Sequence, residues 1–244
     1  MVNATPLTGT GPQVVAQGIH SESVSALHDL GSVVHTNDGR ILRYCKAGAT
    51  ALVMGKLQQA SAEDTSNHQA LTIANAAAGA TSITTTTTVT LAVNALAGGL
   101  LTVESATTGA GQTLRIAGNT AATAAAVTIY LDDPVLVATT GTALIDVILN
   151  PYNGVVVNPT TATSAPVGAA VFNITAAYFG WLQVAGACSI LMDGTGVVGT
   201  AQDASNATAG AVEPHPEAGV QAPVGTLITG VATTDYGFIK LDLL

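Results

Sequence analysis

The chain has 244 residues and a mass of 24.1 kDa, enough for one large β domain or two small ones. Charged residues make up 9% of it, aromatic residues 4% and hydrophobic residues 48%, and the net charge is −9. Six lysine and arginine residues cannot form a basic stripe of any size, so neither a nucleic acid nor an anionic membrane is an expected partner. A surface with few charges is prone to association, and we expect much of it to contact other subunits.

The N-terminal segment, residues 1–69, is predicted to be an arm followed by a hairpin. Residues 1–30 form the extended arm, because glycine and proline residues interrupt any regular pattern there. Two apolar segments then flank Asn37-Asp38-Gly39, which predicts a hairpin over residues 33–44 with Gly39 in a conformation of positive φ. The polar stretch 60–68 is interpreted as a linker.

The middle segment, residues 70–150, is predicted to be a domain of short strands. Apolar and polar residues alternate over residues 89–93, 114–116 and 127–131, which is typical of an antiparallel sheet with one apolar face. The longest apolar run, residues 135–149, is too short to span a bilayer and contains Asp146.

The C-terminal segment, residues 151–244, is predicted to be a second β domain, with strands at 154–157, 169–175, 178–184, 187–192, 224–231 and 237–243. This spacing is typical of a sandwich or small barrel. The last strand alternates, with Ile239 and Leu241 on one face and Phe238 and Lys240 on the other. The predicted fold class is mainly β, with antiparallel sandwich or small-barrel domains and an extended N-terminal arm.

Motifs of catalysis or cofactor binding are absent from the sequence, which has no phosphate-binding loop, no Gly-x-Ser-x-Gly and no His-Glu-x-x-His. His20, His28 and His35 are too widely spaced for the short ligand spacings that zinc sites favour, and we interpret them as ordinary histidines. Cys45 and Cys188 are expected to be buried free thiols, although pairing across subunits stays open. We therefore predict no catalytic residues, no cofactor, no metal site and no enzymatic activity.

Four of the six basic residues are close together in the sequence, namely Arg40, Arg43, Lys46 and Lys56. One interpretation is a hairpin whose charges are solvated, as most charge runs are. The other is a docking patch for an acidic partner such as a protein shell, where complementary charge would set the register of binding.

An aromatic cluster at residues 178–181 contains the only tryptophan of the chain. In a sequence with so few aromatic residues, Tyr178 and Trp181 form either the main core anchor or an interface hot spot. We favour the core, because a β domain of this composition needs at least one large packing residue.

Several glycine-rich stretches carry a resemblance to known proteins. In the C-terminal segment they are residues 178–184, 191–195, 206–212, 223–225 and 236–243, and in the middle segment residues 97–103, 115–120 and 150–154. These stretches resemble the head decoration (cement) proteins of tailed double-stranded DNA bacteriophages and related virion structural proteins. The first 70 residues match nothing in that group.

The resemblance implies a structural protein that is made in the host cytoplasm and sits on the outer capsid surface of a virion. It implies two partners, the major capsid protein and further copies of this chain, with a homotrimer as the expected oligomer. Such a protein would stabilise the head by bridging capsid subunits, because many copies multiply a weak contact. The arm and the hairpin at residues 33–46 are the expected shell-contacting parts, so deleting residues 1–30 is expected to weaken capsid binding and leave oligomerisation intact.

Three other functions are compatible with parts of the sequence. The first is a tail or head fibre, or adhesin module, that binds host surface carbohydrate; its sugar sites would use exposed aromatic residues, which are few here. The major capsid protein would need a long spine helix and a more charged surface. A virion-associated lyase would need a cluster of carboxylates or histidines, and the sequence indicates none.

Overall fold

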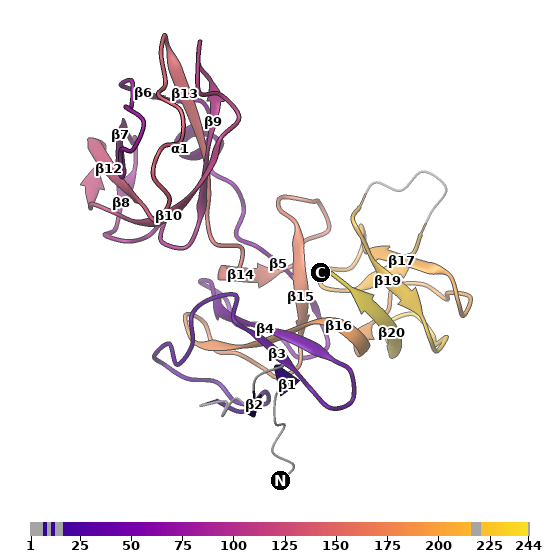
Figure 1. Ribbon diagram of the computed structural model, residues 1–244. Coiled ribbons are helices and arrows are strands. Elements are labelled where there is room, and N and C mark those ends of the chain that lie inside the picture. Colours follow the sequence, from indigo (N-terminus) through magenta and orange to yellow (C-terminus); the bar gives the residue numbers. More distant parts are fainter. Residues whose placement is uncertain (1–6, 9–10, 13–16, 216–220, 244) are drawn as a thin grey trace. The chain divides into compact units, whose positions relative to one another are not determined.

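Strands account for nearly all of the regular structure in this protein. The computed structural model describes residues 7–8, 11–12, 17–215 and 221–243. Within these ranges the only helix is the single turn α1 (Thr65–His68), and all other regular elements are strands (Figure 1). The predicted class, mainly β with sandwich or barrel-like sheets, is confirmed. No helix among the described residues is long and apolar enough to cross a membrane.

Two units make up the chain. Unit 1 contains Met1–Ala62 and Pro151–Leu244, and unit 2 contains Glu63–Asn150, so unit 2 is an insertion in the sequence of unit 1. The predicted segments 1–69 and 151–244 are therefore not separate domains, because most of both belongs to unit 1. The physical reason is strand pairing, because β4 (Ile41–Ala47) lies beside β16 (Phe179–Leu191) in an antiparallel ladder. The boundary between the units falls inside the expected linker, which also contains α1.

A closed ring of five strands forms the centre of unit 1. The ring runs from β4 to β16 and returns to β4 through β15 (Pro166–Ala170), β5 (Leu57–Gln59) and β14 (Asn153–Val157). All of these pairs are antiparallel except β14 with β4, which is parallel. Leu182 and Val184 of β16 pack with Cys45 and Val155 in one buried cluster of the ring strands. A ring of paired strands has no free edge, which is the arrangement of a small barrel.

The strand β16 joins the ring to the rest of one ten-stranded sheet. Its first half pairs with β4, and its second half pairs with β20 (Tyr236–Asp242). From β20 the sheet continues through β19 (Pro223–Leu227), β17 (Ala201–Ala204) and β18 (Val212–Pro214). Gly186 lies at the change of partner with a φ of +90°, a conformation that favours glycine. The two strands predicted at 178–184 and 187–192 are therefore one strand that changes partner at Gly186.

The predicted hairpin is confirmed. β3 (Val33–His35) pairs antiparallel with β4, and Gly39 in the connecting loop has a φ of +83°. Two further short strands, β1 (Leu7–Thr8) and β2 (Gly11–Pro12), pair with each other.

The predicted arm is only partly within the described residues, because residues 1–6, 9–10 and 13–16 lie outside them. From Gln17 onward the chain packs on the ring instead of extending from it. The indole Nε1 of Trp181 donates to the backbone oxygen of Gln17 at 3.2 Å, and the Tyr44 hydroxyl donates to Oε1 of Gln17 at 2.7 Å. The Gln17 side chain is therefore buried, and residues 17–30 are part of unit 1.

Unit 2 is a curled sheet of six strands. In spatial order these are β6 (Leu71–Ile73), β13 (Ala143–Ile148), β9 (Leu100–Ser105), β10 (Thr113–Asn119), β12 (Ala126–Leu131) and β7 (Ser82–Thr86). The two edge strands meet, since Oγ1 of Thr85 donates to the backbone oxygen of Thr72 at 2.9 Å. Alternate residues such as Leu114 and Ile116 fill one core. The strands predicted at 114–116 and 127–131 are confirmed, whereas the strand predicted at 89–93 is only β8 (Thr90–Leu91), paired with β11 (Ala122–Thr123).

Candidate functional site

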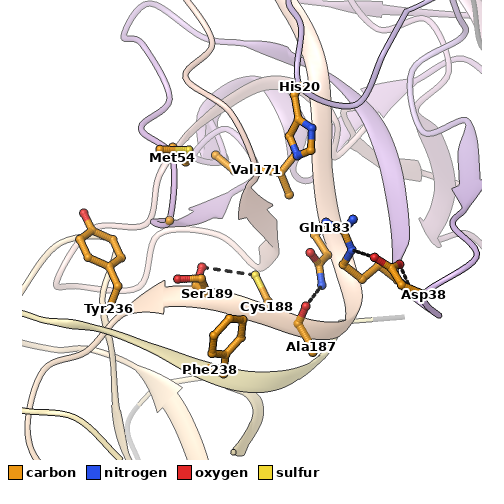
Figure 2. Close-up of a pocket in the computed structure, with 13 residues that line it drawn as sticks. His20, Asp38, Met54, Val171, Gln183, Ala187, Cys188, Ser189, Tyr236 and Phe238 are labelled. Carbon is orange, nitrogen blue, oxygen red and sulfur yellow. Dashed lines mark hydrogen bonds and ion pairs between the residues drawn. The ribbon is translucent and has the colours of Figure 1, made fainter. Parts of the chain in front are cut away.

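A cavity of about 650 Å³ lies in unit 1 where β16 leaves the ring and changes its pairing from β4 to β20. We call it the β16 cavity. Its walls come from the tip of the β3–β4 hairpin, from β16, from β20 and from the segments around Met54 and Val171. Figure 2 shows Asp38 at one end of the cavity, Tyr236 at the other, and Cys188 and Ser189 between them.

The hairpin end of the cavity carries an ion pair. Nε of Arg40 lies 2.8 Å from Oδ2 of Asp38. The hydrogen bond that the Thr36 hydroxyl donates to Asp38 is the main cause that holds the pKa of this carboxyl below its usual value. Desolvation raises this pKa as the second-largest effect, and the hydrogen bonds and charge of Arg40 lower it further. Asp38 is therefore an ionised acceptor whose charge Arg40 balances.

The floor of the cavity includes a thiol. Burial raises the pKa of Cys188 to about 12, although the charge of Arg40 lowers it slightly. A thiol in that range is protonated at neutral pH, and the thiolate is the nucleophilic form. Beside it, Nε2 of Gln183 donates to the backbone oxygens of Ala185 and Ala187, which flank the bend at Gly186. Cys188 and Gln183 thus shape the cavity and do not supply a nucleophile.

The other end of the cavity is aromatic. Tyr236 and Phe238 are two residues apart on β20, so their side chains share one face of that strand, and each is about half exposed (52% and 49%). Met54, also exposed, lines the same end. Sequence alternation had already assigned Phe238 to the face opposite Ile239, and that face is the solvent side. An aromatic residue on the polar face of an alternating strand was therefore the signal that could have found this site.

The predicted basic residues of β4 are divided between its two faces. Nη1 of Arg43 donates to the backbone oxygen of Gly31 at 3.1 Å, and the guanidinium lies 5.5 Å from the ring centre of Tyr152. Nζ of Lys46 lies 5.6 Å from the ring centre of Phe179. Because residues three apart on a strand point in opposite directions, Arg43 and Lys46 face opposite sides.

The other two basic residues lie elsewhere in unit 1. Arg40 is at the hairpin tip in its ion pair, and Lys56 precedes β5 with its aliphatic stem beside Gly210. Arg40, Arg43, Lys46 and Lys56 therefore do not form one continuous basic patch, although they are close in sequence. Only Arg40 lines the β16 cavity.

The predicted aromatic anchors differ in burial. Trp181 is 1% exposed and is the largest fully buried side chain among the described residues, packed with Tyr44 at 5.0 Å between ring centres. Tyr178 is partly buried against the core of the ring. Trp181 is thus buried in the core of unit 1.

The histidines and the second cysteine occupy separate places. His20 is exposed and lines the β16 cavity, whereas the His28 ring packs 5.1 Å from the Tyr44 ring and 5.2 Å from the Trp181 indole. Cys45 is a buried free thiol, and burial raises its pKa to about 12. Among the described residues, no group of three or more His, Cys, Asp or Glu side chains is placed to hold a metal ion.

A second polar cluster lies on β17 and β18. Asp203 is fully buried, and its Oδ2 lies 2.7 Å from Nδ1 of the half-exposed His215. Glu213 is directly opposite Asp203 in the ladder. Burial is the main cause that raises the pKa of Glu213, and the charges of Asp193 and Asp203 raise it further. Two carboxylates side by side on a sheet repel each other, so this cluster disfavours ionisation of Glu213.

Comparisons with protein-family models, with curated proteins and with solved structures gave no match to this chain. The proposal below therefore rests on the amino-acid sequence and on the exposed surface of the chain.

Proposed function

We propose that this protein is a non-enzymatic structural component of a virion, a decoration protein that binds the outside of a tailed phage head and bridges its capsid subunits. The observation that carries the proposal is the apolar surface exposed by both units of a chain in which only 9% of residues are charged. Surfaces of this kind are covered in assemblies, because exposed apolar area associates.

Exposed apolar residues occur in adjacent pairs. In unit 2, Leu100 of β9 and Ile148 of β13 are direct partners in the ladder, and both are exposed. In unit 1, Val197 and Val198 are consecutive exposed residues. Single exposed apolar residues are normal on a monomer, whereas adjacent ones create patches that a partner can bury. Each pair is a candidate contact with a second copy or with the capsid.

The charge of the chain supports a position outside the shell. A net charge of −9 opposes binding to packaged DNA, which carries dense negative charge. The partners in this proposal are the major capsid protein and other copies of the chain, with a trimer as the expected state, as the sequence resemblance implies. The protein would be made in the host cytoplasm and would act on the outer surface of the virion.

Oligomeric state tests the proposal first. Light scattering of the purified full chain should give a trimer, and Ile148→Asp should shift it toward a monomer, because a charge in a buried apolar contact lacks a partner. Val93→Asp is the matched control, since Val93 is another exposed β-branched residue of unit 2 but lies outside the strand ladders. A chain that stays monomeric at all concentrations tested would argue against the proposal.

The position of the protein on virus particles is the second test of the proposal. Cryo-EM of particles from cells that carry the gene, with gold-labelled antibody against the chain, should show label on the outer head. Label confined to the tail or fibres would contradict it and favour host attachment. The arm is best tested by deleting residues 1–16, because a deletion of residues 1–30 also removes Gln17, which is hydrogen-bonded to Tyr44 in the core.

A further inference from the structure

The β16 cavity has the size of a small-molecule site. Its volume of about 650 Å³ lies within the range of roughly 300–1,000 Å³ that is usual for ligand pockets. Its walls are strands and short connections that pack on the ring, so its shape is set by the fold. The proposed structural function does not use this cavity.

The aromatic end is preformed. Gly55 has a φ of +74°, and a Cβ added to it would lie 2.6 Å from Cε1 of Tyr236. The Tyr236 ring therefore packs directly on the Gly55 backbone, at a distance that any other residue would prevent. About half of the Tyr236 side chain nevertheless stays exposed. A ring that is fixed on one side and open on the other is a platform that a flat ligand can cover at little entropic cost.

Polar groups without protein partners line the same cavity. The hydroxyls of Ser189 and Tyr236 and the ring of His20 make no hydrogen bond or ion pair with any residue that the structure describes. At the hairpin end, the charges of Asp38 and Arg40 balance each other. The cavity thus combines an aromatic surface, several free donors and acceptors, and no net charge from its ion pair.

We propose that the β16 cavity binds a neutral saccharide. The ring of Tyr236, with Phe238 beside it, would stack on the C–H face of a sugar, while hydroxyls of the sugar would pair with Ser189, His20 and Asp38. An apolar peptide segment fits less well, because it would bury the free polar groups of the cavity without a partner. The balanced ion pair favours an uncharged sugar over an anionic one.

The experiment uses the full chain and defined oligosaccharides. A glycan array selects the ligand, and isothermal titration with maltotetraose, cellotetraose and triacetylchitotriose measures affinity in solution. At least one neutral glycan should bind, and Tyr236→Ala and Phe238→Ala should each weaken it about tenfold, the loss expected when a stacked ring is removed. The matched control is Tyr130→Ala, because Tyr130 is equally exposed (47%) but lies in unit 2.

A spectroscopic measurement keeps the test independent of mutant folding. In NMR of the unmodified chain, the bound glycan should shift the ring resonances of Tyr236 and Phe238 and leave those of Tyr130 unchanged. Three results would overturn the proposal: no neutral glycan binds at millimolar concentration, only anionic glycans bind, or Tyr130→Ala weakens binding as much as Tyr236→Ala does. A failure here would leave the location of the protein on particles unaffected, so the two proposals are separable.

Discussion

The hydrogen bonds between Gln17 and Tyr44 are expected to fasten the start of the described chain to unit 1. The buried Tyr44 hydroxyl donates to Oε1 of Gln17 at 2.7 Å and accepts from the backbone nitrogen of Leu27 at 3.1 Å. Nε2 of Gln17 donates in turn to the backbone oxygens of Ser21 and Phe179. The substitutions Tyr44→Phe and Gln17→Leu remove these bonds and keep most of the side-chain volume.

The structure sets the expected size of each effect. Tyr44→Phe removes the hydroxyl's bonds to Gln17 and Leu27 and its 3.3 Å contact with the Ser23 hydroxyl, which should cost about 2 kcal/mol of unfolding free energy. Gln17→Leu removes both Nε2 bonds and the bonds that Oε1 accepts from Tyr44 and Ser23, for a cost of about 3 kcal/mol. The Tyr44 hydroxyl then keeps only the Ser23 hydroxyl, at 3.3 Å, as a side-chain partner. The double variant should lose about 1 kcal/mol less than the sum, because the Tyr44–Gln17 bond is then counted once.

Urea unfolding followed by tryptophan fluorescence is the assay. Trp181 is the only tryptophan, so the signal reports unit 1 and not unit 2. Tyr130→Phe in unit 2 is the control and should leave this transition unchanged. If the loss of unfolding free energy in the double variant equals the sum of the two single losses within about 0.5 kcal/mol, Gln17 and Tyr44 are not energetically coupled and the reasoning fails.

Three further effects are expected. Cys45 and Cys188 should react with Ellman's reagent only after unfolding, because burial raises both pKa values to about 12; rapid reaction of the folded chain would contradict this. Burial and nearby carboxylates raise the pKa of Glu213, so its ionisation destabilises the fold as pH rises above 4.5, its usual value. Glu213→Gln should therefore raise Tm at neutral pH but not at a pH below 4.5. An equal rise of Tm at both pH values would refute this assignment. Gly225→Ala should cost about 3 kcal/mol or more in urea unfolding, because the new Cβ would collide with the backbone oxygen of Lys240; a smaller loss would mean that β19 shifts easily.

Part of the fold follows from local sequence. The hairpin at residues 33–44 was predictable because Gly39 meets a requirement of the turn itself, a positive φ. The strand β20 was predictable because its apolar residues recur with period two, which also assigns Phe238 to the outer face. Strand β17 was missed, because its central residues Gln202 and Asp203 are polar and yet fully buried. β17 is paired with β18 on one side and β19 on the other, and no pattern within β17 itself encodes these pairings.

The candidate site could be predicted only in pieces. The basic residues Arg40, Arg43 and Lys46 looked like one group, but the alternation of β4 sends Arg43 and Lys46 to opposite faces. Tyr236 and Phe238 looked like ordinary strand residues. Their meeting with the hairpin tip depends on the pairing of β16 with both β4 and β20, and no local pattern encodes that pairing.

The sequence alone determined that this chain is a β protein with a weakly charged surface. The low charge follows from composition, and the strands follow from apolar and polar residues that alternate along the chain. Only the tertiary structure decided that residues 1–62 and 151–244 form one unit around Glu63–Asn150. Closing the ring requires β4 and β16 to meet across a long stretch of chain. The free energy that favours this contact comes from burying Leu42, Tyr44 and Trp181 together, and it exists only once the strands are paired.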